Sequence, residues 1–160
     1  MKTLMVYATN HGCVEKCTNE LKKRLKGEVV NLDIKKESIK DLSEFDKVII
    51  GGSIYVGKIQ KQLSKFCLNR FDELKEKEIG IFICGLRDGD EGKAQIKTAF
   101  RSELYKKAKV KGYFGGNIIF NKLNFFEKLI IKAICKENKD INNIIIKNID
   151  EFAENMNKIN

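Results

Sequence analysis

Strand-length apolar runs alternate with helix-length amphipathic stretches along most of the chain. Apolar runs occupy residues 2–8, 28–33, 48–51, 78–84 and 110–120. The spacing of apolar residues predicts helices over residues 13–26, 59–74, 91–107, 121–136 and 141–158. Because strands that are apolar throughout are buried on both faces, this alternation predicts a parallel sheet with helices covering each side.

The predicted architecture is a single α/β domain over residues 1–160. A chain of this length can bury a full core without dividing into two domains. Five parallel strands match the doubly wound order 2-1-3-4-5, in which a ligand lies where the strand order reverses, between strands 1 and 3. One extra amphipathic helix follows strand 5. In this topology the loops 9–13, 52–57 and 85–90 meet at the carboxyl ends of the strands.

The first of these loops leads directly from a buried strand into a helix N-terminus through Thr9, Asn10 and Gly12. The free N–H groups and the positive dipole end of a first helical turn suit a phosphate. A single glycine and the lack of a Gly-Lys-Ser/Thr sequence exclude a dinucleotide fingerprint and a Walker loop. An ordinary turn capped by Thr9 or Asn10 is the alternative interpretation.

Composition restricts the class of function and the compartment. The formal net charge is +9, but lysines are spread over the predicted helices without interleaved aromatics, so nucleic-acid binding is not predicted. Five cysteines without the spacing of secreted scaffolds predict a reducing cytoplasm. Cys13 and Cys17 lie one helical turn apart, but no further ligand pair completes a metal site, so none is predicted. No apolar run has the length of a signal segment or a membrane span.

The three loops resemble those of the flavodoxin-like FMN-binding family. Thr9, Gly12 and Glu15 are similar to the family's phosphate loop, Thr-x-Thr-Gly-x-Thr-Glu, whereas His11 and Val14 replace its further hydroxyl side chains. The sequence of residues 51–58, GGSIYVGK, resembles the Gly-x-Ser-Ile-x-x-Gly loop of the menaquinone-dependent protoporphyrinogen dehydrogenases. Members of that branch are also basic and carry an amphipathic segment after strand 5, which residues 125–136 resemble, whereas shuttle flavodoxins are acidic.

This resemblance implies a flavodoxin-like fold and an FMN site. The phosphate would bind the backbone N–H groups of residues 10–14 together with the Thr9 hydroxyl, and the isoalloxazine would lie between the two later loops, against Tyr55. The expected cofactor-binding residues are Thr9, Asn10, His11, Gly12, Cys13, Val14, Ser53, Ile54, Tyr55, Val56, Gly57, Cys84, Gly85, Leu86, Arg87 and Asp88.

Several of these residues also have simpler interpretations. Cys13 at a helix N-terminus would have a lowered pKa, but a small packing residue in a tight turn is the better supported reading. We expect His11 to face solvent, and Tyr55 can instead anchor the next helix. Gly57 would let the backbone approach flavin N5. Arg87 either stabilises the negative charge of the reduced flavin or pairs with its acidic neighbours.

The function predicted from these features is that of an FMN-dependent oxidoreductase that transfers electrons from a protoporphyrinogen-type tetrapyrrole to a quinone. No general acid or base constellation stands near the loops, so no catalytic side chain is predicted and the chemistry would be the flavin's. One alternative is an electron carrier or accessory reductase that serves a redox partner protein. Another is a non-redox binding module.

The segment 121–136 bears on localisation. Lys128, Lys132 and Lys136 recur at helical spacing, opposite a face that includes Phe125 and Phe126. A basic amphipathic helix of this kind can lie on an anionic membrane, where a quinone is available. The alternative is a helix that packs on the sheet with its lysines in water. We therefore expect a cytoplasmic protein, with peripheral contact at the inner face of the membrane left open.

Overall fold

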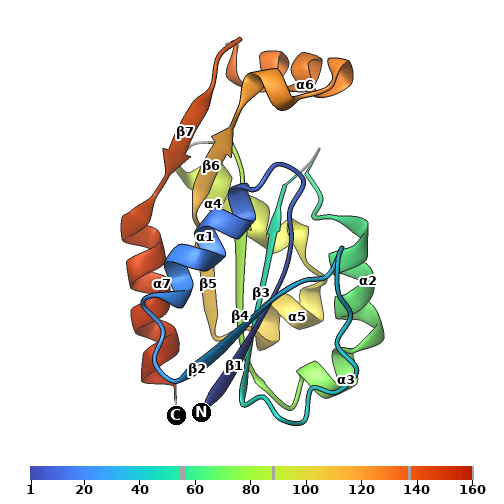
Figure 1. Cartoon of the computed structure of the whole chain (residues 1–160), viewed down its shortest axis with the longest axis vertical. Coiled ribbons are helices and arrows are strands. Elements are labelled where there is room, and N and C mark those ends of the chain that lie inside the picture. The colour runs from blue at the N-terminus through green and yellow to red at the C-terminus, as the bar shows by residue number, and fades with distance from the viewer. Residues whose placement is uncertain (55–56, 88, 137, 160) are drawn as a thin grey trace.

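The computed structural model describes residues 1–54, 57–87, 89–136 and 138–159. Its main sheet has five parallel strands in the order β2-β1-β3-β4-β5, which confirms the predicted sheet and its strand order (Figure 1). Val6 of β1 lies opposite Ile50 of β3, and Ile50 lies opposite Ile81 of β4. The strands are β1 (Lys2–Ala8), β2 (Glu28–Asp33), β3 (Lys47–Ser53), β4 (Glu78–Cys84) and β5 (Val110–Tyr113).

Helices cover both faces of this sheet, and alternate residues along each strand enter two separate cores. Leu4 and Val6 enter the core beneath α2 (Lys61–Asn69), α3 (Phe71–Leu74), α4 (Gly89–Ala99) and α5 (Ser102–Lys107). Met5 and Tyr7 enter the core beneath α1 (Cys13–Lys22) and α7 (Ile146–Lys158). The period-two alternation of a strand thus assigns each residue to one core or the other.

Two of the predicted helices are divided in the structure. The predicted helix 59–74 is interrupted at Arg70, whose guanidinium donates to the carbonyls of Ile39 and Lys40. The predicted helix 91–107 divides into α4 and α5, with a break before Ser102. Helix α1 ends at Lys22, before the predicted boundary at residue 26. Each of these helices still packs against the sheet through its apolar residues.

The prediction of one strand over residues 110–120 is wrong. After β5 the chain turns at Gly115, whose φ is +72°, and continues as β6 (Gly115–Ile118). Strand β6 pairs antiparallel with β7 (Ile141–Ile144), so the predicted helix 141–158 begins only at Ile146. A Cβ on Gly115 would lie 1.9 Å from the carbonyl oxygen of Asn143. Glycine is therefore the residue that allows both the turn and the close approach of β7.

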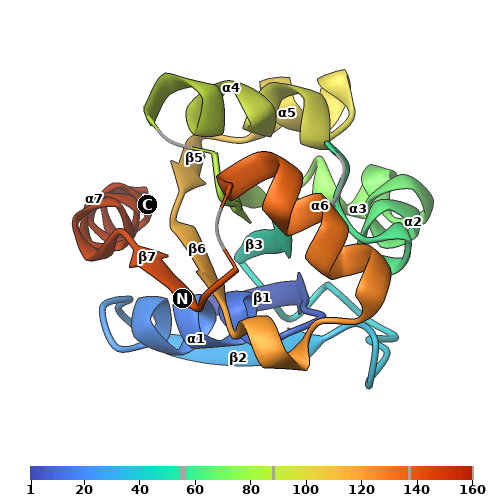
Figure 2. The ribbon, with the colours of Figure 1, turned by 90° about the horizontal axis from the view of Figure 1, so that it is seen from above.

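Helix α6 (Phe125–Cys135) lies between β6 and β7 in the sequence, after a short 3₁₀ turn, η1 (Phe120–Lys122). It begins later than the predicted residue 121 because Asn124 and Glu127 form a capping box there. Seen from above, α6 crosses the carboxyl end of the sheet (Figure 2). The ribbon of β6 and β7 thus carries the predicted extra helix to the edge where the three loops meet.

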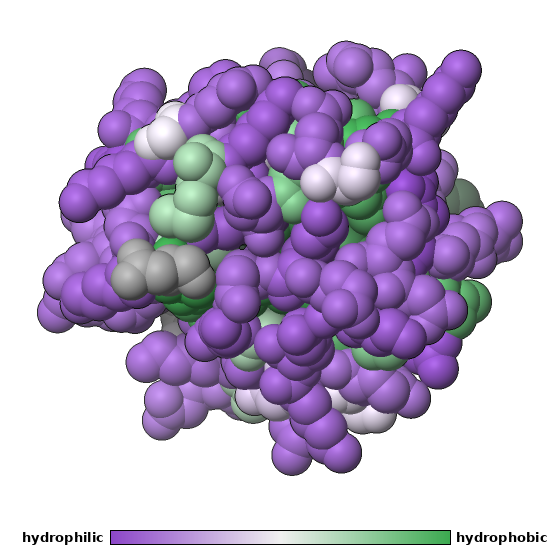
Figure 3. Space-filling view, turned by 90° about the horizontal axis from the view of Figure 1, so that it is seen from below, coloured by the Kyte–Doolittle hydropathy of each residue, from purple (hydrophilic) through white to green (hydrophobic). Residues whose placement is uncertain are grey.

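The end of the molecule opposite the three loops has a mostly hydrophilic surface. Hydrophilic side chains cover most of the face seen from below, at the amino ends of the strands (Figure 3). Within the described ranges, none of the helices combines the length and the apolar character needed to span a bilayer.

Candidate functional site

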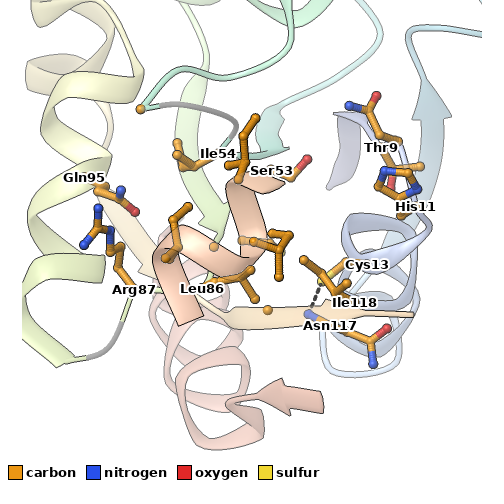
Figure 4. A pocket seen from close by; sticks show the side chains of 18 of the residues that line it. Thr9, His11, Cys13, Ser53, Ile54, Leu86, Arg87, Gln95, Asn117 and Ile118 are labelled. Atoms are coloured by element: carbon orange, nitrogen blue, oxygen red, sulfur yellow. Dashed lines mark hydrogen bonds between the residues drawn. The ribbon is translucent and has the colours of Figure 1, made fainter. Parts of the chain in front are cut away.

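A cavity of about 450 Å³ lies at the carboxyl edge of the main sheet (Figure 4). Its size falls within the range of small-molecule sites. The loops after β1, β3 and β4 form its walls, β6 borders it, and α6 lies over it. The structure places these predicted site residues around the cavity: Thr9, Asn10, His11, Cys13, Ser53, Ile54, Gly57, Cys84, Gly85, Leu86 and Arg87.

Two of the predicted residues that the structure describes, Val14 and Gly12, do not border the cavity. Val14 is fully buried in the core beneath α1, and Gly12 caps that helix with φ of +81° without bordering the cavity. The predicted contacts of Tyr55, Val56 and Asp88 lie outside the described residues. The side chain of Val14 therefore serves packing, and at this position only the backbone N–H remains as a donor for a ligand.

The loop after β1 is closed by its own hydrogen bond. Gly12 N–H donates to Thr9 Oγ1 at 2.9 Å, so this N–H is already used, while the Thr9 hydroxyl keeps its own proton to donate. The N–H groups of Cys13 and Val14, in the first turn of α1, have no carbonyl one turn earlier to bond. The loop therefore offers a hydroxyl and first-turn N–H groups at the positive end of a helix dipole.

Lys35 adds positive charge beside this loop. Its Nζ lies 3.1 Å from the carbonyl oxygen of Thr9 and 2.9 Å from Asn10 Oδ1. This lysine was not among the predicted site residues, because it follows β2 and only the pairing of β1 with β2 brings it to the loop. The ammonium group makes the loop more favourable for an anion.

His11 connects the loop to α6. Its Nε2 lies 3.0 Å from Glu127 Oε1, a contact that links residues 116 positions apart. The expectation that His11 faces solvent is therefore wrong, because its half-buried side chain meets the first turn of α6. Glu127 also belongs to the capping box of that helix. The contact joins the phosphate-type loop to the helix that covers the cavity.

Backbone bonds hold the other two loops in place. Ile54 N–H donates to the carbonyl of Cys84 at 2.8 Å, and Gly85 N–H donates to that of Gly115 at 3.0 Å. The Tyr113 hydroxyl donates to Gly85 O at 2.8 Å and also contacts the carbonyl of Arg87. These contacts position the loops after β3 and β4 as two walls of the same cavity.

The polar residues divide between two sides of the cavity. Thr9 and His11 lie on one side, and Arg87 and Gln95 lie on the opposite side (Figure 4). The guanidinium of Arg87 is 3.5 Å from Glu91 Oε2, which is the pairing with an acidic neighbour that the sequence suggested. Among the described residues, the side-chain oxygen of Gln95 is buried without a hydrogen-bond partner. A ligand's polar edge would satisfy it.

The lining residues that α4, β6 and α6 contribute were not predicted from the sequence. The signal for β6 was the Gly115-Gly116 pair, since paired glycines inside an apolar run indicate a bulge or an end of the strand. Nothing in the sequence marks Gln95 as a cavity residue. The missed lining residues are Gln95, Gly116, Asn117, Ile118, Ile130, Ile131, Ala133 and Ile134.

The thiol of Cys13 has an unusual environment. Hydrogen bonds from the thiols of Cys17 and Cys84 lower the pKa of Cys13 to about 4, and the Asn117 N–H, 3.2 Å from its sulfur, acts in the same direction. The bond to Cys13 correspondingly raises the pKa of Cys17, and that of Cys84 is raised as well. The pKa of Cys13 is therefore lowered, but the main cause is the neighbouring thiols and not the helix N-terminus from which the sequence predicted it.

The cavity fits FMN in its distribution of groups. One side has the hydroxyl, the first-turn N–H groups and Lys35 for a phosphate, while Ile54 and Leu86 supply apolar walls. The unpartnered oxygen of Gln95 lies on the other side, where the polar edge of a flavin would need a hydrogen bond. Residues 4–144 match a family model described as a flavodoxin domain.

The chain belongs to the flavodoxin-domain family. Solved flavodoxins share its fold. The Fusobacterium nucleatum flavodoxin bound to flavin mononucleotide is 18% identical, with a TM-score of 0.57 over 98% of this chain and 97% of that one. Oxidised flavodoxin 1 from Bacillus cereus is 14% identical, with a TM-score of 0.58 over 100% and 99%. The family resemblance and the fold inferred from the sequence are thereby confirmed.

One curated protein with a similar sequence is named as an enzyme. This flavodoxin-domain chain is 25% identical over 144 residues to the protoporphyrinogen IX dehydrogenase [quinone] of Leishmania major. The match covers 84% of this chain and 62% of that protein. The chain thus spans less than two thirds of the length of that relative.

Proposed function

We propose that this flavodoxin-domain protein binds FMN in the cavity and oxidises a protoporphyrinogen-type tetrapyrrole, passing the electrons to a quinone. The observation that carries the proposal is the position of α6, which lies over a cavity built from the three ligand loops. A bound flavin supplies the redox chemistry by taking up electrons from one partner and releasing them to another. The protein's part is to bind and orient the flavin and the substrate, and to exclude water from them.

Each group of residues has a distinct part in this proposal. The Thr9 hydroxyl, the N–H groups of Cys13 and Val14 and the ammonium of Lys35 bind the phosphate. Ile54, Leu86 and the other apolar residues enclose the ring system, while Gln95 donates to or accepts from its polar edge. Burial of the ring against apolar walls removes water from the site and raises the free-energy cost of adding negative charge to it.

The roof of the cavity favours a large apolar substrate. Ile130, Ile131 and Ile134 of α6 border the cavity, and they would contact any molecule placed above the loops. A tetrapyrrole and a quinone are both extended apolar molecules, and the acidic groups of a tetrapyrrole are complementary to the net charge of +9. The relative named as a protoporphyrinogen IX dehydrogenase supports the same assignment.

An electron carrier for a partner protein is the second candidate. The match to solved flavodoxins extends over 97% and 99% of their chains, whereas the match to the dehydrogenase covers 62% of that protein. Agreement in length with small flavodoxins favours a carrier or accessory reductase. Under this reading α6 would bind a partner protein rather than a small substrate.

Anaerobic turnover separates the two candidates. We expect the FMN-loaded protein to oxidise protoporphyrinogen with a menaquinone analogue as electron acceptor. The increase in porphyrin fluorescence measures the rate. Ile134→Asp places a charge in the roof and should lower kcat/KM at least about tenfold, because a carboxylate that borders the cavity disfavours an apolar substrate. The control Ile146→Asp changes an exposed residue of α7 and should leave kcat/KM unchanged. Flavin binding without porphyrinogen oxidation would contradict the proposed enzymatic activity and favour the electron-carrier function.

The exposed face of α6 supports a contact with anionic lipid. Phe125 is 71% exposed, Phe126 75% and Leu129 51%, on a helix that also carries Lys128 and Lys132. We propose that this face binds the surface of an anionic membrane, from which a quinone can reach the cavity. Apolar insertion and lysine–phosphate attraction would act together.

Vesicle binding tests this contact. We expect the protein to co-sediment with phosphatidylserine vesicles, and less so at high salt, because screening weakens the lysine contribution. The double change Phe125→Ser and Phe126→Ser should weaken binding at least about tenfold, since each ring buries apolar area in the interface. Leu68→Ser is the matched control, because Leu68 is 51% exposed on α2, away from this face. Equal binding by both variants would contradict the assignment.

A further inference from the structure

Three cysteines from two parts of the chain meet at the wall of the cavity. Cys13 and Cys17 lie one turn apart on α1, and Cys84 ends β4. All three are buried, and their sulfur atoms lie within 4.8 Å of one another, with Cys17 Sγ and Cys84 Sγ 3.6 Å apart. The sequence showed only the first pair, so the third ligand comes from the tertiary structure.

These distances match the requirements of a trigonal metal site. Sulfur atoms bound at about 2.3 Å around a central ion, in one plane, lie about 4 Å from one another. Small shifts of the three thiols would therefore enclose an ion without displacing the backbone. Simple packing explains the burial of three small side chains, but it does not require three sulfur atoms at one point.

The surroundings of Cys13 supply what a thiolate ligand needs. The N–H of Asn117 donates to Cys13 Sγ at 3.2 Å, which is the kind of outer hydrogen bond that tunes metal-bound sulfur (Figure 4). Cys13 is also the first residue of α1, where the helix dipole favours negative charge. Because Cys13 borders the cavity, an ion has a route to the cluster.

The number and type of ligands select the ion. Structural zinc sites are almost always four-coordinate, and among the described residues this metal-ligand group consists of Cys13, Cys17 and Cys84 alone. Three soft sulfur ligands in an apolar core instead suit monovalent copper. Binding would release the thiol protons to solvent, so that the three thiolates and one Cu⁺ leave a net charge of −2 beside the N-terminus of α1.

We propose that Cys13, Cys17 and Cys84 form a three-sulfur site for a soft monovalent ion of the Cu⁺ type. The site adjoins the proposed flavin site, with which it shares Cys13 and Cys84. It does not depend on flavin binding or on any redox activity of the protein.

Anaerobic titration with Cu⁺ against a chromophoric Cu⁺ chelator tests the proposal on the fully reduced chain. We expect one ion per chain and X-ray absorption that shows three sulfur neighbours at about 2.3 Å. Cys17→Ala and Cys84→Ala should each lower the affinity by more than about 100-fold, since loss of an outer hydrogen bond alone costs 10- to 100-fold. Cys67→Ala is the matched control, because Cys67 is a buried free thiol in the other core.

Several outcomes would overturn the site. Failure of the reduced protein to retain Cu⁺ against the chelator would do so, as would equal affinity in the Cys17→Ala and Cys67→Ala proteins. Two sulfur neighbours in the absorption spectrum, or tighter binding of Zn²⁺ than of Cu⁺, would contradict the three-coordinate assignment. The spectrum of the unaltered protein keeps the test decisive even where a cysteine variant fails to fold.

Discussion

Thr9→Asp is expected to abolish tight FMN binding while leaving the fold intact. The carboxylate can accept the hydrogen bond from Gly12 N–H that Thr9 Oγ1 now accepts, so the loop keeps its closure. It also places a negative charge where the phosphate would bind. Two unit charges 4 Å apart repel by about 4 kcal/mol at an effective dielectric constant near 20. With Thr9 half-buried, we expect the Kd for FMN to rise at least about 100-fold.

Riboflavin is the internal control for this prediction, because it has the ring system of FMN without the phosphate. Its Kd should change by less than about threefold in Thr9→Asp, since the added charge then has no anion to repel. Thr9→Ser keeps the hydroxyl and should bind FMN as the unaltered protein does. Fluorescence titration gives each of these dissociation constants. An equal loss of FMN and riboflavin affinity would place the phosphate elsewhere or show a damaged loop.

The second large effect concerns the core beneath α1 and α7. Gly51→Ala is expected to destabilise the protein by about 3 kcal/mol, at the upper end of typical overpacking costs. A Cβ at Gly51 would lie 2.0 Å from Cζ of Phe82. That ring cannot move aside, because it stacks on Phe114 at 4.4 Å between centroids and meets Phe152 edge-on at 6.2 Å.

Chemical denaturation of single and double variants measures this clash. Phe82→Leu shortens the side chain, so Gly51→Ala in that background should cost at least about 1 kcal/mol less than it does alone. Gly85→Ala is the control, because its Cβ would meet no neighbour closer than 3.4 Å. If the free energy of unfolding of Gly51→Ala lies within about 0.5 kcal/mol of that of the unaltered protein, the core around Phe82 is packed more loosely than these contacts indicate.

Local sequence predicted the parts of the fold that local physics decides. The bounds of β1, β2 and β4 agree with those predicted from the apolar runs, because each run is ended by polar or glycine residues. The sheet order followed from the alternation of strands and helices, which leaves few alternatives for a chain of this length. The three loops were also found from the sequence, since the carboxyl ends of parallel strands share one edge of a sheet.

The features that the sequence left undetermined all depend on contacts between distant residues. Antiparallel pairing of β6 with β7, in which Gly115 lies opposite Ile144, produces the ribbon that carries α6 over the cavity. The local sequence of neither strand indicates which strand it pairs with. Lys35, Glu127 and Gln95 reach the site from the turn after β2, from α6 and from α4 in the same way.

The family, the parallel sheet and the three loops could thus be inferred from the sequence, because short motifs and the alternation of strand and helix patterns encode them. The position of α6 over the cavity and the approach of Cys84 to Cys13 and Cys17 are visible only in the folded chain. Both depend on side chains brought together across the fold. Such contacts come from the packing of whole elements, which no local spacing of residues records.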